Sequence, residues 1–240
     1  PLPLFLRFFA NHGLLQIHDH PPWRTIIGGS QKYIDALVRP FHKCIRLRTT
    51  VDRIQRNDAG VKIHTTNNGW ESYDKVVIAI HADHAFKLLE TPTQDEADSL
   101  GVIPYRKNIA TLHTDRTVLP RSPRAWASWN YNIENCHTSR TPLRMTYYLN
   151  RLQRLQTRKH YCVTLNGEEL INPAHILASI PYEHPIYTPG GLHARDIVRL
   201  ISGQNHTFYC GAYLGNGFHE DGMVSGLAIR RTLDQMREAT

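Results

Sequence analysis

Near its end the 240-residue chain reads Thr207-Phe-Tyr-Cys-Gly-Ala-Tyr-Leu-Gly-Asn-Gly-Phe-His-Glu-Asp-Gly222. The apolar start of this stretch, residues 207–210, predicts a strand, and residues 223–237 predict a helix. The glycine-rich loop between them leads into a helix N-terminus, whose unpaired N–H groups attract phosphates and other electron-rich ligand atoms. The spacing alone leaves two interpretations open, a ligand-binding loop or a plain connection capped by Asp221.

A second strand, turn and helix are predicted between residues 23 and 41. Residues 25–27 predict a short strand, Gly28 and Gly29 a turn, and the residues after Ser30 an amphipathic helix. The glycine pair either lets backbone N–H groups approach a ligand or only makes a tight turn.

Three strands are predicted between residues 44 and 80. Segments 45–54, 61–66 and 73–80 are rich in β-branched or alternating apolar residues, and turn residues separate them. The third segment ends in a continuous apolar run, which is typical of a strand buried on both faces. A helix is predicted to follow over residues 82–89.

Residues 93–188 are predicted to form a second domain, between residues 1–92 and 189–240 of the first. Proline, histidine and aromatic residues are denser here, and strands are predicted at 108–114, 143–149 and 161–164 of a mixed sheet. Aromatic side chains such as Trp129 and Tyr148 either line an apolar substrate cavity or form an aromatic core.

The composition is that of an ordinary globular protein, with 41% hydrophobic and 20% charged residues. The longest apolar runs are too short to span a bilayer, and no secretion signal is recognisable, so a cytoplasmic location is expected. The net charge of +7 suits an anionic substrate, a phosphate-bearing cofactor or an anionic membrane surface. The basic residues are scattered, and no nucleic-acid motif is present.

Metal and hydrolase chemistry lack their motifs. The chain has fifteen histidines, but none lies in HExxH, and the four cysteines form no CxxC pair. No GxSxG is present either. No metal site is predicted, and a metal-dependent hydrolase is kept only as a third hypothesis.

The run from Gly211 to Gly226 resembles the C-terminal FAD motif of flavin-containing amine oxidoreductases, and more narrowly that of a bacterial group described as predicted NAD/FAD-binding proteins. Further segments agree in the family's order: 7–13, 22–24, 28–33, 112–115, 125–131, 146–153 and 163–166. The resemblance implies an α/β fold with mixed α+β character. It would be a partial two-domain FAD-binding fold of the amine-oxidase type, with a β-meander and a mixed-sheet substrate domain.

The family's dinucleotide-binding motif, GxGxxG, is not found in this sequence. Gly215 and Gly217 give GxG, but Glu220 occupies the third position. The chain is therefore expected to be a C-terminal fragment, whose partner is a missing N-terminal half of the same protein.

The resemblance also implies which residues meet FAD. Gly211 and Ala212 would approach the pyrophosphate and ribityl chain, and the backbone N–H groups of Gly222, Met223 and Val224 would meet the flavin N1/O2 edge. The remaining cofactor-binding residues would be Asp221 in the same loop, Val51 at the adenine and Ala79 at a strand end near the nucleotide. For Val51 a plain role in the β core is an equal alternative.

In this family the flavin N5 accepts a hydride, so the resemblance implies an FAD-dependent oxidoreductase. His219 and Phe218 are the catalytic candidates beside the flavin. The expected substrate is apolar or amphipathic, such as a lipid acyl chain or an amine, and peripheral membrane contact is expected as well. The alternative is a non-catalytic, flavoprotein-like module that binds a partner or a membrane.

Overall fold

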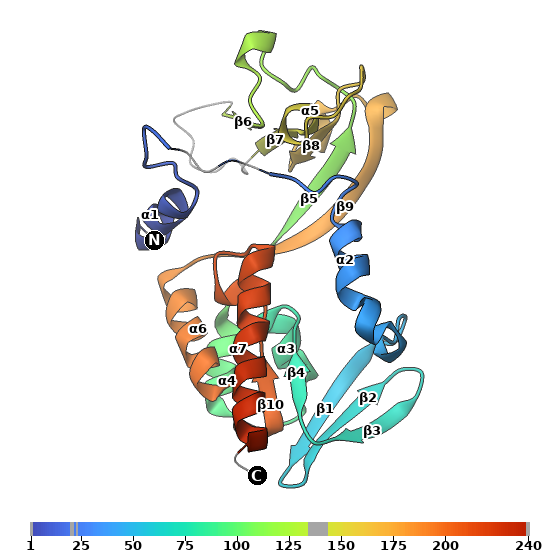
Figure 1. Ribbon diagram of the computed structural model, residues 1–240, viewed down its shortest axis with the longest axis vertical. Helices are drawn as coiled ribbons and strands as arrows, with labels where there is room; N and C mark the ends of the chain where they lie inside the picture. The colour runs from blue at the N-terminus through green and yellow to red at the C-terminus, as the bar shows by residue number, and fades with distance from the viewer. Residues whose placement is uncertain (1, 20–21, 23, 134–143, 239–240) are drawn as a thin grey trace. The chain divides into compact units, whose positions relative to one another are not determined.

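The computed structural model describes residues 2–19, 22, 24–133 and 144–238. The chain forms two compact units, the first from Pro1–Tyr105 with Pro185–Thr240 and the second from Arg106–His184. Figure 1 labels their helices and strands. The domain limits predicted from the sequence, after residues 92 and 188, stay a prediction.

The first unit contains the three-stranded antiparallel meander that the resemblance implies. Its first two strands overlap the predicted segments 45–54 and 61–66, but its third lies ahead of the predicted segment 73–80. It consists of β1 (Val51–Asn57), β2 (Gly60–Thr65) and β3 (Gly69–Tyr73), in that order. Asn57 pairs with Gly60 across the first turn. A side chain on Gly60 would lie 2.6 Å from the carbonyl oxygen of Tyr73, so only glycine allows this close approach of the third strand.

A two-stranded parallel sheet pairs segments far apart in the sequence. β4 (Val76–Ile78) lies beside β10 (Thr207–Tyr209), which is fully buried. The prediction of one long strand over residues 73–80, buried on both faces, is wrong: β4 is short and Val77 is 44% exposed. Val77 is exposed because the described chain covers only one face of β4.

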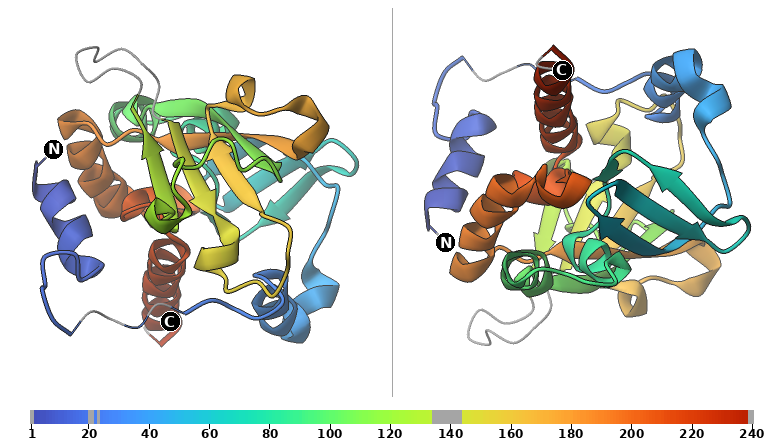
Figure 2. Two further views of the ribbon diagram at one scale, coloured as in Figure 1. Left: turned by 90° about the horizontal axis from the view of Figure 1, so that it is seen from above. Right: turned by 90° about the horizontal axis from the view of Figure 1, so that it is seen from below.

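Helices complete the first unit, and α6 and α7 are neighbours in the views of Figures 1 and 2. The α-helices are α1 (Leu2–Asn11), α2 (Gln31–Val38), α3 (Ala82–Leu88), α4 (Gln94–Ser99), α6 (Pro189–Ile201) and α7 (His219–Glu238); the 3-10 helices are η1 (Arg39–Cys44), η2 (Leu100–Val102), η6 (Gln204–His206) and η7 (Ala212–Leu214). The predicted helices after Ser30 and at 82–89 are thereby confirmed. No helix among the described residues is long and apolar enough to cross a membrane.

The strand predicted at residues 25–27 is absent. These residues have no regular structure, and Ile27 is 94% exposed. A strand needs a partner for its backbone groups, and none lies beside this segment in the described chain.

A buried ion pair joins the meander to the helices. Arg56 on β1 donates two hydrogen bonds to Glu96 on α4, with Nη1–Oε1 at 2.5 Å and Nη2–Oε2 at 2.9 Å. The hydroxyl of Tyr209 on β10 donates to the same carboxylate at 2.6 Å. The three side chains therefore link β1, α4 and β10 through the core of this unit.

The second unit is built on a five-stranded sheet in the order β6-β7-β8-β5-β9. Its strands are β5 (Tyr105–His113), β6 (Trp129–Asn132), β7 (Arg144–Tyr148), β8 (Cys162–Leu165) and β9 (Ile176–Pro185), with the short helices η3 (Pro123–Ala125), α5 (Leu149–Leu152), η4 (Glu168–Leu170) and η5 (Pro173–His175). The predicted strands at 108–114, 143–149 and 161–164 correspond to β5, β7 and β8. Buried threonines on these strands bond one another, for example Thr146 to Thr164 at 2.9 Å.

Candidate functional site

The glycine loop leaves the sheet where both parallel strands end. Because β4 and β10 are parallel, their carboxyl ends lie at the same edge, and Gly211 follows β10 there. A Cβ at Gly211 would lie 2.8 Å from the ring of Tyr213 and 3.6 Å from the carbonyl oxygen of Ile80. The absence of a side chain lets the loop turn closely over the sheet edge, which is where ligands bind in open α/β sheets.

The start of the loop packs directly on α7. The Ser225 hydroxyl accepts a hydrogen bond from the Gly211 amide at 3.0 Å and donates to the Gly222 carbonyl at 2.7 Å. A Cβ at Gly222 would lie 3.7 Å from the amide nitrogen of Ala212. The structure thus brings together three of the predicted cofactor-binding residues, Gly211, Ala212 and Gly222, although their contact with a cofactor stays a prediction.

Helix α7 begins at His219, so the predicted start at residue 223 is wrong. A carboxylate oxygen of Asp221 accepts a hydrogen bond from the Phe218 amide at 2.9 Å, which caps the helix earlier. The amide of Gly222 already donates to the Phe218 carbonyl at 3.3 Å.

This earlier start changes which amides are free. Met223 and Val224 follow Gly222 inside α7, so their amides are not those of an open helix end. Among the described residues, the amides of His219, Glu220 and Asp221 have no hydrogen-bond acceptor. The electropositive end of the helix is therefore the turn 219–221.

The two catalytic candidates lie at this helix end. The Nδ1 of His219 lies 2.9 Å from the hydroxyl of Tyr33 on α2. Phe218 is 44% exposed, and its ring centroid is 6.1 Å from that of Phe8 and 5.3 Å from that of His12. Residues of α1, α2 and the following chain thus surround the first turn of α7, while the catalytic roles of His219 and Phe218 stay predictions.

The other two predicted cofactor residues lie in the same unit. Val51 begins β1, is half-buried and packs against the core, as the alternative interpretation of that residue expects. Ala79 follows β4 and is exposed at the sheet edge that Gly211 also occupies. Their roles at a nucleotide stay predictions.

The two predicted cavity residues, Trp129 and Tyr148, belong to separate aromatic groups. Trp129 pairs with Tyr147 across β6 and β7, and successive residues of a strand face opposite sides. The Tyr148 ring instead lies 5.2 Å from that of Trp126, and its hydroxyl bonds the ring of His160 at 2.8 Å. Trp129 and Tyr148 therefore lie on opposite faces of the sheet, and their role as cavity walls stays a prediction.

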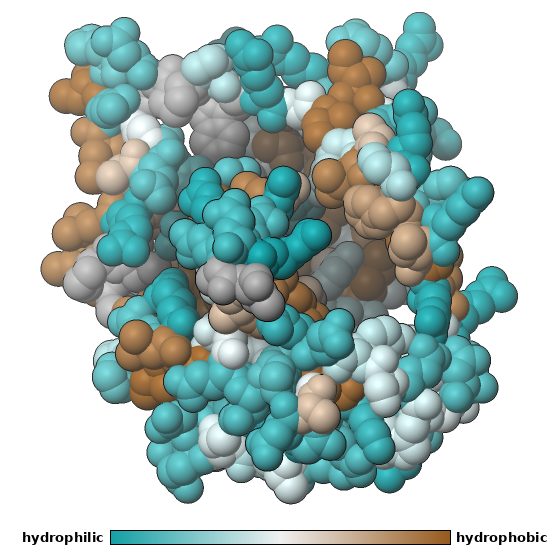
Figure 3. All heavy atoms as spheres, turned by 60° about the horizontal axis from the view of Figure 1, so that its bottom comes forward, coloured by the Kyte–Doolittle hydropathy of each residue, from teal (hydrophilic) through white to brown (hydrophobic). Residues whose placement is uncertain are grey.

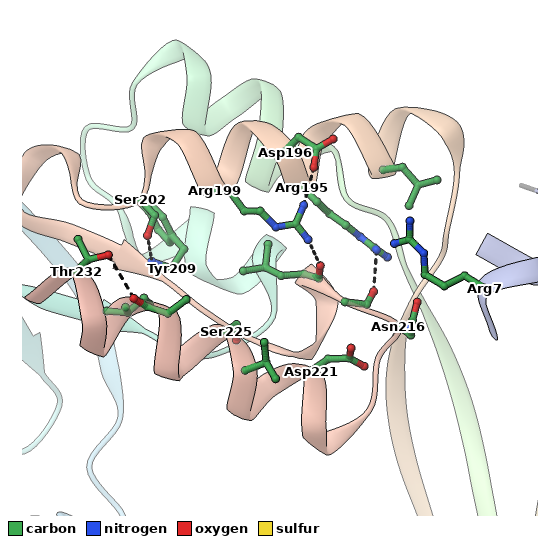
Figure 4. Close-up of a pocket in the computed structure, with 16 residues that line it drawn as sticks. Arg7, Arg195, Asp196, Arg199, Ser202, Tyr209, Asn216, Asp221, Ser225 and Thr232 are labelled. Carbon is green, nitrogen blue, oxygen red and sulfur yellow. Dashed lines mark hydrogen bonds and ion pairs between the residues drawn. The ribbon is translucent and has the colours of Figure 1, made fainter. Parts of the chain in front are cut away.

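A cavity of about 700 Å³ lies between α6 and α7, and residues 214–216 of the glycine loop form part of its lining (Figure 4). Charged residues line it: Arg7, Arg195, Asp196, Arg199 and Asp221. The sequence analysis missed Arg195 and Arg199. Their spacing of four residues, beside the apolar Ala194 and Val198, was the available signal for arginines on one face of a helix.

Comparison with known proteins identifies the family. The family model for flavin containing amine oxidoreductase matches residues 5–168, about two thirds of the chain. No curated protein matches the sequence.

Several solved structures share the fold, which confirms the predicted fold class. One is a fatty acid isomerase from P. acnes that produces CLA, with 16% identity, a TM-score of 0.58, and coverage of 85% of this chain and 52% of that one. Cyclohexylamine oxidase from Brevibacterium oxydans has 13% identity and a TM-score of 0.57, with coverage of 86% of this chain and 53% of that one. Putrescine oxidase has 11% identity and a TM-score of 0.56, with coverage of 88% of this chain and 53% of that one.

The chain spans about half the length of these matched proteins. At such low identity the structural similarity establishes the fold, while the family match rests on the sequence itself. The chain therefore belongs to the family of flavin-containing amine oxidoreductases.

Proposed function

We propose that the chain is the C-terminal half of an FAD-dependent oxidoreductase. The observation that carries this proposal is the first turn of α7, whose amides at residues 219–221 have no acceptor within the described chain. That turn adjoins the carboxyl edge of a parallel sheet, where open α/β folds bind ligands. Membership of a flavin-containing family supports FAD as the ligand.

The residues present suit the electron-rich edge of a flavin. The amides of Glu220 and Asp221 would donate to that edge, and the helix dipole adds positive charge there. Gly211 and Gly222 carry no side chains where the loop meets the helix, so the backbone itself forms the surface. No protein group competes for these amides in the described residues.

FAD binding needs a further part of the protein, in our proposal. The sequence contains no GxGxxG, and the sheet of β4 and β10 has no third strand among the described residues. A parallel sheet is normally buried on both faces, but Val77 of β4 is exposed. An N-terminal half that pairs a strand with β4 and carries GxGxxG would complete both the sheet and the pyrophosphate site.

Exposed apolar side chains support the proposal that an N-terminal half of the protein packs against this unit. Figure 3 shows one face, on which hydrophobic side chains lie in patches between hydrophilic ones. The exposed large apolar residues include Val77, Ile80, Met223, Val224 and Leu227, on β4 and α7 or next to them. Their position on the elements nearest the proposed cofactor agrees with burial by the N-terminal half.

When bound, a flavin supplies hydride acceptance at N5. The protein's own contribution would be to orient and shield the reacting groups. The first turn of α7 would stabilise negative charge on the reduced ring, and the Phe218 ring would exclude water. His219, held by Tyr33, would move protons, since imidazole is the side chain best suited to this at neutral pH.

We propose an apolar or amphipathic substrate, of the lipid acyl or amine class. The structures that share the fold include a fatty acid isomerase and two amine oxidases, which act on molecules of these two classes by their names. The net charge of +7 supports contact with an anionic substrate or an anionic membrane surface. A fatty-acid carboxylate would meet the first of these requirements.

The experiment is to express the complete reading frame that contains this chain and to purify its product without added flavin. We expect a yellow protein whose visible bands bleach with dithionite and which releases FAD on heating. Circular dichroism of the same sample serves as the control for folding. A folded, colourless product that takes up no FAD would contradict the proposal and favour the non-catalytic module.

A further inference from the structure

Helix α6 holds the glycine loop through a buried arginine. Arg195 is only 6% exposed, and its Nη1 donates to the carbonyl of Gly215 at 2.7 Å. Its guanidinium lies 4.3 Å from the ring centroid of Tyr187, a cation–π contact. Figure 4 shows the side chain pointing from α6 toward the loop.

A second arginine repeats the contact one helical turn later. Arg199 donates to the carbonyl of Leu214, the residue before Gly215, and pairs with Asp196 at 2.6 Å. The helix itself is firmly started, because Pro189 is its first residue and the Thr188 hydroxyl accepts from the Gly191 amide at 3.0 Å. Two consecutive loop carbonyls are therefore fixed on the side of α6.

The direction of these carbonyls decides the direction of the loop amides. In a trans peptide the C=O and N–H groups point to opposite sides, so a Gly215 carbonyl held by Arg195 turns the Asn216 N–H away from α6. The amides of Gly215 and Gly217 both donate to the Ala212 carbonyl at 3.1 Å. The Asn216 amide has no acceptor among the described residues.

The protein itself only partly offsets the free-energy cost of burying the Arg195 charge. Burial lowers the pKa of Arg195, because desolvation penalises the guanidinium cation. Within the described residues no carboxylate forms an ion pair with it: Asp221 and Asp196 act only from a distance to raise its pKa in part, and its hydrogen bond goes to a neutral carbonyl. A buried charge held in this way is costly, which argues for a role beyond stability.

We propose that Arg195 is a positioning residue for the cofactor: it holds the Gly215 carbonyl on the α6 side, so that the Asn216 amide and the first turn of α7 are presented to FAD. This inference rests on the proposed function. Arg199 assists at Leu214, and Tyr187 supports the guanidinium from its other side. The carbonyl oxygens of Leu214 and Gly215, whose partial negative charge would repel an anionic cofactor, are thereby held away from it.

The first test measures FAD affinity in the product of the complete reading frame. Arg195→Met is expected to weaken FAD binding about tenfold, the effect of one charge-assisted hydrogen bond. Arg195→Lys keeps a donor and a charge, so it is expected to restore part of the affinity. The control is Arg230→Met, an exposed arginine of α7 that pairs with Asp234 at 3.5 Å and should bind FAD as the wild type does.

The second test needs no cofactor. Hydrogen exchange of residues 215–217 in the flavin-free protein should be faster in Arg195→Met than in the wild type, with the helix α7 itself unchanged. Unchanged exchange would overturn the positioning role. Faster exchange with unchanged FAD affinity would show that the contact serves stability alone. Failure of the wild type to bind FAD would instead contradict the proposed function, so the two failures are distinguishable.

Discussion

Replacing Arg56 with methionine is expected to lower the free energy of unfolding by about 3–5 kcal/mol, because it leaves the Glu96 carboxylate buried without its cation. The side chains of Arg56 and Glu96 are only 5% and 4% exposed. Methionine fills a similar volume, so the loss comes from the unpaired charge and not from a cavity. Two hydrogen bonds to the carboxylate remain, from the Tyr209 hydroxyl to Oε1 and from the Thr93 amide to Oε2, but neither donor carries a charge.

The measurement is chemical denaturation of Arg56→Met and the wild type, followed by circular dichroism. The matched control is Arg46→Met, which removes an arginine that also bonds both carboxylate oxygens of a glutamate, Glu71, but at the surface. We expect the control to change stability little, because water replaces the lost partner. Equal, small losses for both variants would show that the Arg56–Glu96 pair does not stabilise the fold.

The same pair predicts a dependence of stability on pH. Burial acts to raise the pKa of Glu96, but hydrogen bonds from Arg56 and Tyr209 outweigh it and hold the pKa below its ordinary value. A lowered carboxyl pKa contributes stability above the unfolded value, near 4.5, and this stability is lost as the pH falls through the lower folded value. In Arg56→Met only the hydrogen bonds from Tyr209 and Thr93 still lower this pKa, so this part of the acid dependence should shrink, and an unchanged pH profile would contradict the account.

Replacing Gly215 with alanine is expected to cost about 2 kcal/mol, from a lost helix cap and local overpacking. A Cβ at Gly215 would lie 2.5 Å from the Cβ of Asp221 and closer still to its carboxylate. Asp221 must then move, and the Phe218 amide loses its acceptor. Because the displaced turn is the proposed flavin contact, we also expect the loss of most bound FAD.

A double-mutant cycle isolates this contact. Asp221→Gly, which removes the Cβ as well as the carboxylate, should alone cost about 2 kcal/mol, for the lost cap and for a glycine inside the helix. Gly215→Ala added to Asp221→Gly should then change stability by less than about 0.5 kcal/mol, since the whole side chain it would strike is gone. Denaturation of the four proteins measures the coupling. Additive losses would show that Gly215 and Asp221 do not interact as the structure has them.

Local sequence patterns predict most of the helices and strands discussed above. Alternating apolar residues and turn residues predict the first two strands of the meander, and three-four spacing predicts α2. The false strand at 25–27 shows the limit, because an apolar triplet forms a strand only where a partner lies beside it. The burial of β4 likewise depends on what covers it, which no local pattern records.

The site was predictable in outline but not in its contacts. The glycines of the loop and its junction with α7 follow from residue type and spacing. The start of α7 does not, because Asp221 caps the preceding turn instead of preceding the helix. Arg195 looks like any helical arginine until Gly215, twenty positions away, is brought to its guanidinium. The role of such a residue depends on partners far away in the sequence, and residue spacing does not predict those partners.

The central claim is that the first turn of α7 faces the electron-rich edge of a bound flavin. The most direct measurement is a crystal structure of the complete reading frame's product with FAD. We predict that a flavin oxygen or nitrogen lies about 3 Å from a backbone amide nitrogen of His219, Glu220 or Asp221. A structure in which these amides contact only protein, with the flavin bound elsewhere, would contradict it.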